Sequence, residues 1–229
     1  MITLKNVTKI MDNNVILDNI NLNLEEGKIY GLVGRNGSGK SILLKVICGF
    51  LKPTEGIVLV DNKDLAKEPV FPESIAALIE RPNYIPDLNA FDNLFMIASI
   101  KNIIGQKEIE DTLKLVNLAN DNKSFKKYSL GMKQKLGIAQ VLMEKPKIMI
   151  LDDTTSAVDN ETEYKIRQSI KSQSRGHTSF IISHRVSSFE NCDVILVLQN
   201  GELVQMGSHE ELMAQSGYYK TVWNEQNEI

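Results

Sequence analysis

Eight consecutive residues carry the strongest chemical signal in the sequence: Gly34-Arg35-Asn36-Gly37-Ser38-Gly39-Lys40-Ser41. They fit Gly-x-x-x-x-Gly-Lys-[Ser/Thr], the pattern of the phosphate-binding P-loop. Its glycines let backbone N–H groups turn toward phosphate oxygens, at a helix N-terminus whose dipole favours anions. In this pattern Lys40 reaches the β- and γ-phosphates, and the Ser41 hydroxyl holds Mg²⁺. The motif therefore predicts that all eight residues form a nucleoside triphosphate site.

A second group of candidate residues follows a buried strand. Residues 147–151 are predominantly apolar and lead directly into Asp152 and Asp153. P-loop enzymes place such an aspartate beside the loop, where it supports Mg²⁺, so we expect Asp152 and Ser41 to share the metal. Asp153 follows directly, and a second carboxylate here would be able to polarise an attacking water. Two adjacent carboxylates repel each other unless a cation or water screens them, which favours a site over a structural role.

The elements that must position these residues alternate between strands and helices. A strand over 28–33 leads into the P-loop, and a helix over 40–50 follows it. Apolar residues at helical spacing predict a helical insertion within 87–140. Further strands are expected at 2–8, 15–24, 57–60, 76–79, 148–151, 179–182 and 194–198. This alternation predicts an α/β core with parallel strands.

Two local signals concern the C-terminal part. Asn200-Gly201 between apolar runs predicts a tight hairpin turn. Ser208 with Glu211 predicts a capping box that begins a late helix.

Composition narrows the function further. The chain has 229 residues, 42% of them hydrophobic, with a net charge of −3, so we expect no nucleic-acid partner. The lysines within 123–135 are interpreted as a solvated face.

The cysteines and the apolar runs exclude two further features. Cys48 and Cys192 lack metal-type spacing and are expected to be buried thiols. No apolar run approaches the ~20 residues of a membrane helix, so any membrane crossing falls to another chain or segment.

Several segments resemble the ATP-binding domains of ABC transporters. Leu151 to Asp159 resembles the Walker B and D-loop of that family, and Tyr128 to Gln134 resembles its signature motif, usually written Leu-Ser-Gly-Gly-Gln. Ile181 to Arg185 resembles the H-loop, with His184 as the switch histidine. Glu80 stands where the family has its Q-loop glutamine. The order and spacing of these segments match across essentially the whole chain.

The resemblance implies a single ABC ATPase domain over residues 1–229. It implies an α/β P-loop NTPase core with an N-terminal antiparallel β part and a helical subdomain at about 82–140. It further implies a subunit that binds and hydrolyses Mg-ATP and drives efflux through separate transmembrane partners, on the cytoplasmic face of the membrane. The groove around residues 81–95 is where the family receives its membrane partner.

The resemblance also assigns roles to residues outside the P-loop. Ser129 and Gly131 would offer a hydroxyl and N–H groups to the γ-phosphate of ATP held by a second ATPase subunit, in a homo- or heterodimer. His184 would contact the γ-phosphate and the water, and Glu80 would serve catalysis and Mg²⁺. Met11 falls where the family stacks an aromatic ring on adenine.

Three of these positions depart from the family pattern. Asp153 replaces the catalytic glutamate and is one methylene shorter, which predicts slow hydrolysis with near-normal ATP binding. Glu80 keeps an oxygen ligand but adds charge. Met11 lacks an extended π-surface, which predicts loose base selectivity.

The two parts of the chain resemble different branches of the family. Residues up to about 145 resemble ATPase subunits of the peptide-antibiotic immunity and efflux group. Residues from 151 onward resemble multidrug-exporter ATPase domains, so we hypothesise a mosaic with a seam near residue 150.

Three alternatives stay open. One is a catalytically weak, regulatory half of an asymmetric ABC pair, and another is a soluble ABC ATPase without a transport role. A different P-loop enzyme such as a GTPase is the third, but the sequence has no Asn-Lys-x-Asp element for guanine recognition.

Overall fold

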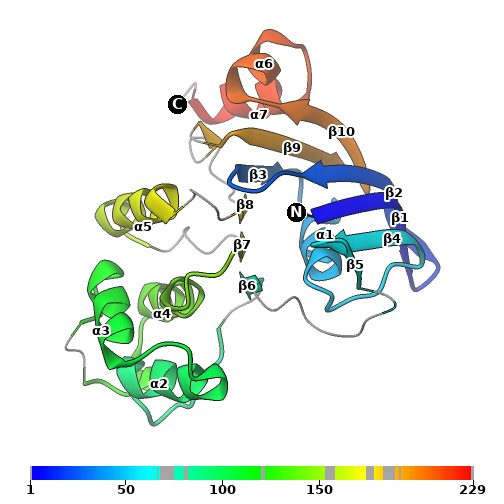
Figure 1. Cartoon of the computed structure of the whole chain (residues 1–229). Helices are drawn as coiled ribbons and strands as arrows, with labels where there is room; N and C mark the ends of the chain where they lie inside the picture. Colours follow the sequence, from blue (N-terminus) through cyan, green and yellow to red (C-terminus); the bar gives the residue numbers. More distant parts are fainter. Residues whose placement is uncertain are drawn as a thin grey trace.

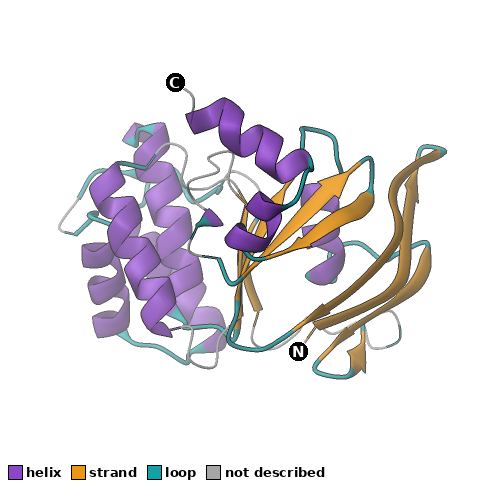
Figure 2. Ribbon diagram, turned by 90° about the horizontal axis from the view of Figure 1, so that it is seen from above, coloured by secondary structure: helices purple, strands orange, loops and turns teal. Residues whose placement is uncertain are grey.

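The computed structural model describes residues 2–65, 67, 75–79, 82–119, 122–152, 158–173, 178–182, 189–190 and 192–227. Two β-sheets and a group of helices make up this part of the chain (Figure 1). Viewed from above, the larger sheet lies between the helical region on one side and the smaller sheet on the other (Figure 2). The architecture is the α/β fold with an antiparallel β part that the sequence predicts.

The smaller sheet is antiparallel and holds the N-terminal strands. Its order is β2-β1-β4-β5, with strands β1 (Ile2–Met11), β2 (Asn14–Leu24), β4 (Glu55–Val60) and β5 (Lys63–Asp64). Leu4 is opposite Leu22 on one side and Val58 on the other, and all three side chains are buried. Alternation of apolar and polar residues along β1 therefore fixes which face of this sheet packs inward.

The larger sheet is parallel except at one edge. Its order is β10-β9-β3-β8-β7-β6, with strands β6 (Ile75–Leu78), β7 (Ile148–Asp152), β8 (Thr178–Ile182), β3 (Ile29–Val33), β9 (Val194–Gln199) and β10 (Glu202–Gly207). Only β10 runs antiparallel to its neighbour. All five residues of β3 are buried, as expected for a strand covered on both faces.

Successive side chains of the central strands enter two different cores. Tyr30 and Leu32 of β3 pack toward the smaller sheet, whereas Ile29 and Val33 pack toward the helices. The same alternation holds along β7. Because side chains of a strand alternate between faces, this sheet separates the two hydrophobic cores.

Helices occupy both faces of the larger sheet. They are α1 (Lys40–Ile47), α2 (Ala90–Lys101), α3 (Gln106–Leu115), η1 (Phe125–Lys127), α4 (Leu130–Met143), α5 (Asn160–Gln173), α6 (His209–Ala214) and α7 (Tyr218–Asn227). Helix α1 lies between the two sheets, and α2 to α4 form the group at the other side (Figure 2). Helices α2 to α4 are inserted between the neighbouring strands β6 and β7.

Both local predictions for the C-terminal part are confirmed. Strands β9 and β10 pair through a two-residue turn in which Asn200 has φ 49° and Gly201 φ 84°, as a type I′ turn requires. The Ser208 hydroxyl accepts from the N–H of Glu211, whose carboxylate accepts from the N–H of Ser208. This capping box begins α6.

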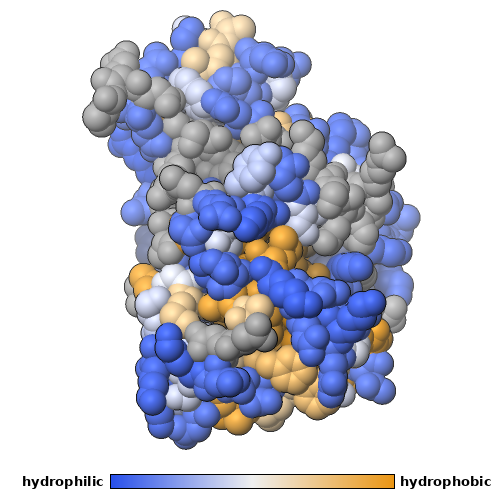
Figure 3. Space-filling view, turned by 90° about the vertical axis from the view of Figure 1, so that its left-hand side faces the viewer, coloured by the Kyte–Doolittle hydropathy of each residue, from blue (hydrophilic) through white to orange (hydrophobic). Residues whose placement is uncertain are grey.

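The helical side of the molecule carries exposed apolar side chains. Figure 3 shows apolar residues among strongly hydrophilic ones in its lower half, at the height of α2 to α4. Exposed large apolar residues on α2 and just after it are Phe95, Met96, Ile100 and Ile103. None of the helices in the described ranges is both long enough and apolar enough to cross a membrane.

Candidate functional site: a P-loop nucleotide site

The P-loop runs from the end of β3 to the start of α1, at the carboxyl edge of the larger sheet. Gly39 is the N-cap of α1 and has φ 101°, a conformation that side chains rarely adopt. A Cβ atom at this position would lie 2.8 Å from the Ile16 carbonyl oxygen of β2. No side chain caps α1 and its first turn has no acidic residue, so the helix N-terminus can receive an anion.

The lysine of the loop that is predicted to bind phosphate is largely enclosed. Lys40 is only 9% exposed, and its Nζ donates to the carbonyl oxygens of Gly34 at 2.7 Å and Arg35 at 2.9 Å. These bonds hold the ammonium group inside the curve of the loop. Ser38 is also buried, and within the described part of the chain its Oγ has no hydrogen-bond partner.

The two residues expected to share a metal ion are in direct contact. The Ser41 Oγ donates to Asp152 Oδ2 at 2.7 Å, although 111 residues separate them in the sequence. Asp152 is the last residue of β7, one strand removed from β3 in the sheet. A hydroxyl beside a carboxylate is the kind of oxygen pair that Mg²⁺ uses together with phosphate oxygens. The residues present therefore fit the expected Mg²⁺.

A cavity of about 320 Å³ opens over this pair. Its lining combines P-loop residues, the start of α1, Asp152 and one residue of β2. The lining residues are Ile16, Asn36, Gly37, Gly39, Lys40, Ser41, Ile42 and Asp152. The cavity thus joins the phosphate-binding loop to an apolar side chain of the smaller sheet.

Ile16 lines this cavity but is not among the site residues that the sequence predicts, whereas Met11 is the predicted adenine contact. Met11 is the last residue of β1, 37% exposed, and is not among the lining residues. The only sequence signal at Ile16 is the apolar run through residues 15–17. Such a run does not distinguish a residue that contacts a ligand from a residue of the hydrophobic core. The role of Met11 stays a prediction.

The turn between β9 and β10 is hydrogen-bonded to the P-loop. The Gly201 N–H donates to the Ser38 carbonyl oxygen at 3.1 Å, and the Asp18 N–H donates to the Gly201 carbonyl oxygen at 2.9 Å. The turn therefore connects the P-loop to β2 of the smaller sheet. Sequence reasoning identified the turn but gave no sign of this contact.

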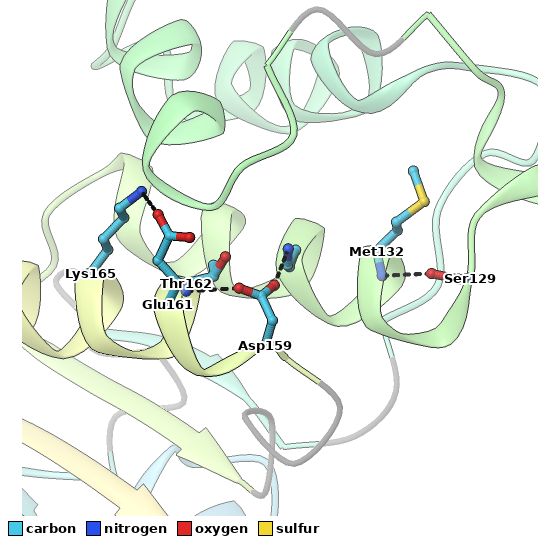
Figure 4. A network of polar contacts seen from close by, with 7 residues as sticks. Ser129, Met132, Asp159, Glu161, Thr162 and Lys165 are labelled. Atoms are coloured by element: carbon cyan, nitrogen blue, oxygen red, sulfur yellow. Dashed lines mark hydrogen bonds and ion pairs between the residues drawn. The ribbon is translucent and has the colours of Figure 1, made fainter.

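The signature-like segment lies at the start of α4. Ser129 is exposed and is the N-cap of α4, where its Oγ accepts from the Met132 N–H at 3.3 Å (Figure 4). Gly131 is in the first turn of the same helix. Neither residue lines the cavity beside the P-loop. This arrangement leaves the α4 N-terminus accessible, away from the chain's own P-loop cavity.

Three predicted site residues lie outside the described part of the chain: Glu80, Asp153 and His184. Their strands are described. Strand β6 ends two residues before Glu80, β7 ends immediately before Asp153, and β8 ends two residues before His184. The roles of these three residues stay predictions.

Comparison with known proteins places the chain among ATP-binding subunits. It is 39% identical over 206 residues to the uncharacterised ABC transporter ATP-binding protein YybJ of Bacillus subtilis, covering 89% of this chain and 94% of that protein. It is 33% identical to the lantibiotic transport ATP-binding protein SrtF of Streptococcus pyogenes, covering 89% of each. It is also 34% identical to the alpha-hemolysin translocation ATP-binding protein HlyB of Escherichia coli. The alignment with HlyB covers 89% of this chain but only 30% of HlyB.

A solved structure of an ATP-binding cassette is also similar to this chain. The dimeric post-hydrolysis state of the ATP-binding cassette MJ0796, bound to ADP and phosphate, superposes with a TM-score of 0.82 at 29% identity. The match covers 91% of this chain and 98% of that one. The family described as ABC transporter matches residues 17–156, which include the P-loop, the signature-like segment and Asp152. This chain therefore belongs to the ABC transporter ATP-binding family.

Proposed function

We propose that this chain binds and hydrolyses Mg-ATP to drive an efflux transporter whose membrane-spanning parts are separate. The observation that carries the proposal is the 2.7 Å contact between Ser41 and Asp152 at the cavity beside the P-loop. Lys40 and the α1 N-terminus would bind the phosphates, and Ser41 with Asp152 would hold Mg²⁺. When bound, Mg²⁺ neutralises charge that develops on the phosphate oxygens.

The names of the relatives support a role in export. SrtF is described as a lantibiotic transport protein and HlyB as a translocation protein. Peripheral association with the cytoplasmic face of a membrane follows from such a role. The transported substrate of this chain is not specified by these similarities.

A shallow apolar pocket supports a site for the membrane partner. It has a volume of about 430 Å³ and lies between the end of α1 and strand β6. Phe50 is 55% exposed there, and Pro82 lies at the start of the segment that the family uses for its membrane partner. An exposed aromatic ring beside a pocket is a typical anchor for a protein partner.

A second ATPase domain would complete each site. Ser129 and Gly131 begin a 14-residue helix, so the α4 N-terminus favours an anion. Because neither residue lines the chain's own cavity, the γ-phosphate they would contact belongs to ATP on another subunit. The solved MJ0796 relative is described as a dimer, which supports this reading.

Hydrolysis at this site is proposed to be slow. Asp153 would act as the general base, His184 would contact the γ-phosphate, and Glu80 would contribute to the metal. An aspartate in place of glutamate moves the carboxylate by one methylene, and small misplacements of a catalytic group cost on the order of a hundredfold in rate. Asp153 thereby favours a second candidate function, an ATP-binding regulatory half with little turnover.

The proposal is tested with the purified chain and Mg-ATP, by nucleotide titration, size-exclusion chromatography and phosphate release. We expect the wild type to bind ATP, to elute as a dimer with ATP, and to turn over slowly. Lys40→Ala should lose binding because its ammonium reaches the phosphates. Asp153→Glu should turn over faster, by up to about a hundredfold.

The outcomes separate the parts of the proposal. A wild type that does not bind ATP would contradict the nucleotide site itself. Binding without dimer formation would contradict the shared site, and a dimer without turnover would indicate the regulatory half. Equal rates in wild type and Asp153→Glu would remove Asp153 as the cause of slow hydrolysis.

A further inference from the structure

The sequence contains two Asn-Gly dipeptides, and the structure places them in opposite environments. One is Asn36-Gly37 in the P-loop, and the other is Asn200-Gly201 in the turn between β9 and β10. Asparagine before glycine is prone to deamidation, because glycine has no side chain to hinder attack of its backbone nitrogen on the asparagine amide. In a folded chain the reaction depends on what holds that nitrogen and on the space around it.

The nitrogen of the P-loop pair is unhindered. Asn36 and Gly37 are both exposed. Within the described ranges the Gly37 N–H donates no hydrogen bond, whereas the next N–H along the chain, that of Ser38, donates to the Arg35 carbonyl oxygen at 3.1 Å. A Cβ atom on Gly37 would meet nothing within 4 Å, so there is open space beside this nitrogen. The Gly37 nitrogen can therefore approach the Asn36 side chain.

The nitrogen of the second pair is held. Gly201 is buried, and its N–H donates to the Ser38 carbonyl oxygen at 3.1 Å. The space around Gly201 is also filled, since a Cβ atom there would lie 2.6 Å from the Ile16 carbonyl oxygen. A buried N–H must give up its hydrogen bond before its nitrogen can attack, and breaking that bond costs free energy. The contact between the turn and the P-loop thus protects Asn200.

We propose that Asn36 is a site of spontaneous deamidation in the P-loop and that bound nucleotide protects it, the protection resting on the proposed function. The Gly37 nitrogen loses its proton to solvent base and bonds to the Asn36 Cγ atom, and ammonia leaves as a cyclic imide closes. Water then adds to either imide carbonyl and reopens the ring. The product is aspartate, or isoaspartate with an extra methylene in the backbone. Overall, one amide and one water become one carboxylic acid and one ammonia.

The position of the pair gives this reaction a consequence for nucleotide binding. Both Asn36 and Gly37 line the cavity beside the P-loop. Bound phosphates accept from the N–H groups of such a loop, which would engage the Gly37 nitrogen and displace water. Either product places a carboxylate where the phosphates bind, and isoaspartate also lengthens the loop backbone. A chain stored without nucleotide therefore loses ATP binding with time.

The test is incubation of the purified full chain at mildly alkaline pH, with peptide mapping of both dipeptides over time. We expect Asn36 to react about tenfold faster than Asn200, the factor that corresponds to one buried backbone hydrogen bond. In denaturant, where neither nitrogen is held, the two rates should be similar. A non-hydrolysable ATP analogue with Mg²⁺, at about ten times its dissociation constant, should slow Asn36 about tenfold, since about a tenth of the chains are then free.

Three variants connect the reaction to its residues, each compared with its own fresh sample. Asn36→Gln keeps an amide on a longer side chain that closes a ring more slowly, and should hold its initial ATP affinity through the incubation. Asn200→Gln is the matched control and should lose affinity as wild type does. Gly37→Ala adds a methyl group that hinders the nitrogen, and should slow Asn36 while leaving Asn200 unchanged.

Each outcome bears on the inference. Equal rates at Asn36 and Asn200 in the folded chain would overturn it, and so would equal losses of ATP affinity in wild type and Asn36→Gln. An analogue that binds without slowing Asn36 would overturn the protection. If Gly37→Ala does not fold, the ratio of the two rates in wild type decides the question. Fresh wild type that does not bind the analogue contradicts the proposed function, whereas the rates at the two dipeptides still test the deamidation.

Discussion

At the scale of single residues, burial decides the chemistry that a side chain can perform. Lys40 is enclosed, and its side-chain nitrogen donates hydrogen bonds to two carbonyl oxygens of the loop. Cys48 is enclosed at the end of α1 with no exposed surface. Burial raises the pKa of the Cys48 thiol to about 12, because the thiolate loses its hydration. Burial therefore has a different consequence for each side chain. The Lys40 amine is held by hydrogen bonds within the P-loop, whereas the Cys48 thiol is expected to be unreactive toward thiol reagents.

Cys48 is therefore expected to resist thiol reagents in the folded protein. The thiolate is the reactive form, and with this pKa its fraction at pH 8 is on the order of one in ten thousand. The measurement is labelling by a chromogenic disulfide reagent in Cys192→Ser, which isolates Cys48. Full labelling in denaturant is the control. Labelling of the folded protein at the rate of a free thiol would contradict the prediction.

At the scale of elements, the β9–β10 hairpin positions the P-loop from a distance of more than 160 residues along the chain. Gly201 donates to Ser38 of the loop and accepts from Asp18 of β2. A Cβ atom on Gly201 would lie 2.6 Å from the Ile16 carbonyl oxygen, closer than real contacts allow. The turn thus requires glycine for its positive φ and for its close packing.

Gly201→Ala is expected to destabilise the protein more than Gly37→Ala does. Both residues have φ near +80°, but a Cβ on Gly37 would meet nothing within 4 Å. Backbone strain alone should cost about 1 kcal/mol in Gly37→Ala, and the added collision should raise the loss to about 3 kcal/mol in Gly201→Ala. Urea unfolding measures both free energies. Equal losses would mean that the contact with β2 contributes nothing.

At the scale of the whole molecule, the larger sheet separates two cores, and ion pairs connect the helices on its outer side. Lys101 of α2 pairs with Glu144 after α4 at 2.7 Å, and Lys135 of α4 pairs with Asp159. The Lys135 ammonium, together with the Thr162 N–H, holds the pKa of the Asp159 carboxyl well below its ordinary range. The ionised Asp159 carboxylate therefore contributes to the free energy of unfolding.

This lowered pKa predicts how stability depends on pH. A carboxyl group whose pKa falls on folding stabilises the native state above its unfolded pKa, about 3.9, and the contribution is lost as pH falls toward the folded value. We expect wild type to melt about 2 °C above Asp159→Asn at pH 7. The gap should narrow progressively below about pH 4. Melting curves from pH 7 to 3 test this, and a gap that stays constant or widens on acidification would contradict it.

Much of the fold was predictable because its signals are local. The run through β3 and the glycines of the P-loop determine a strand, a turn and a helix within about twenty residues. Helix α5 was not predicted, because over its 14 residues the buried apolar side chains are sparse, chiefly Ile166 and Ile170. Packing on neighbouring elements stabilises such a helix, and a short-range pattern does not reveal it.

By itself, the sequence determined the chemistry of the site. Residue types and spacing identify a phosphate loop, a hydroxyl and a carboxylate for a metal, and the ABC family. The pairing of Ser41 with Asp152 was expected from the motifs, and the tertiary structure shows it as a direct hydrogen bond. Only the tertiary structure decided that Gly201 meets Ser38 and that Lys135 meets Asp159. Each of these contacts joins residues more than twenty positions apart, on different elements. The periodic pattern of apolar residues predicts structure only within one helix or strand. Contacts between elements depend on the order of the strands and on the face of the sheet that each side chain enters.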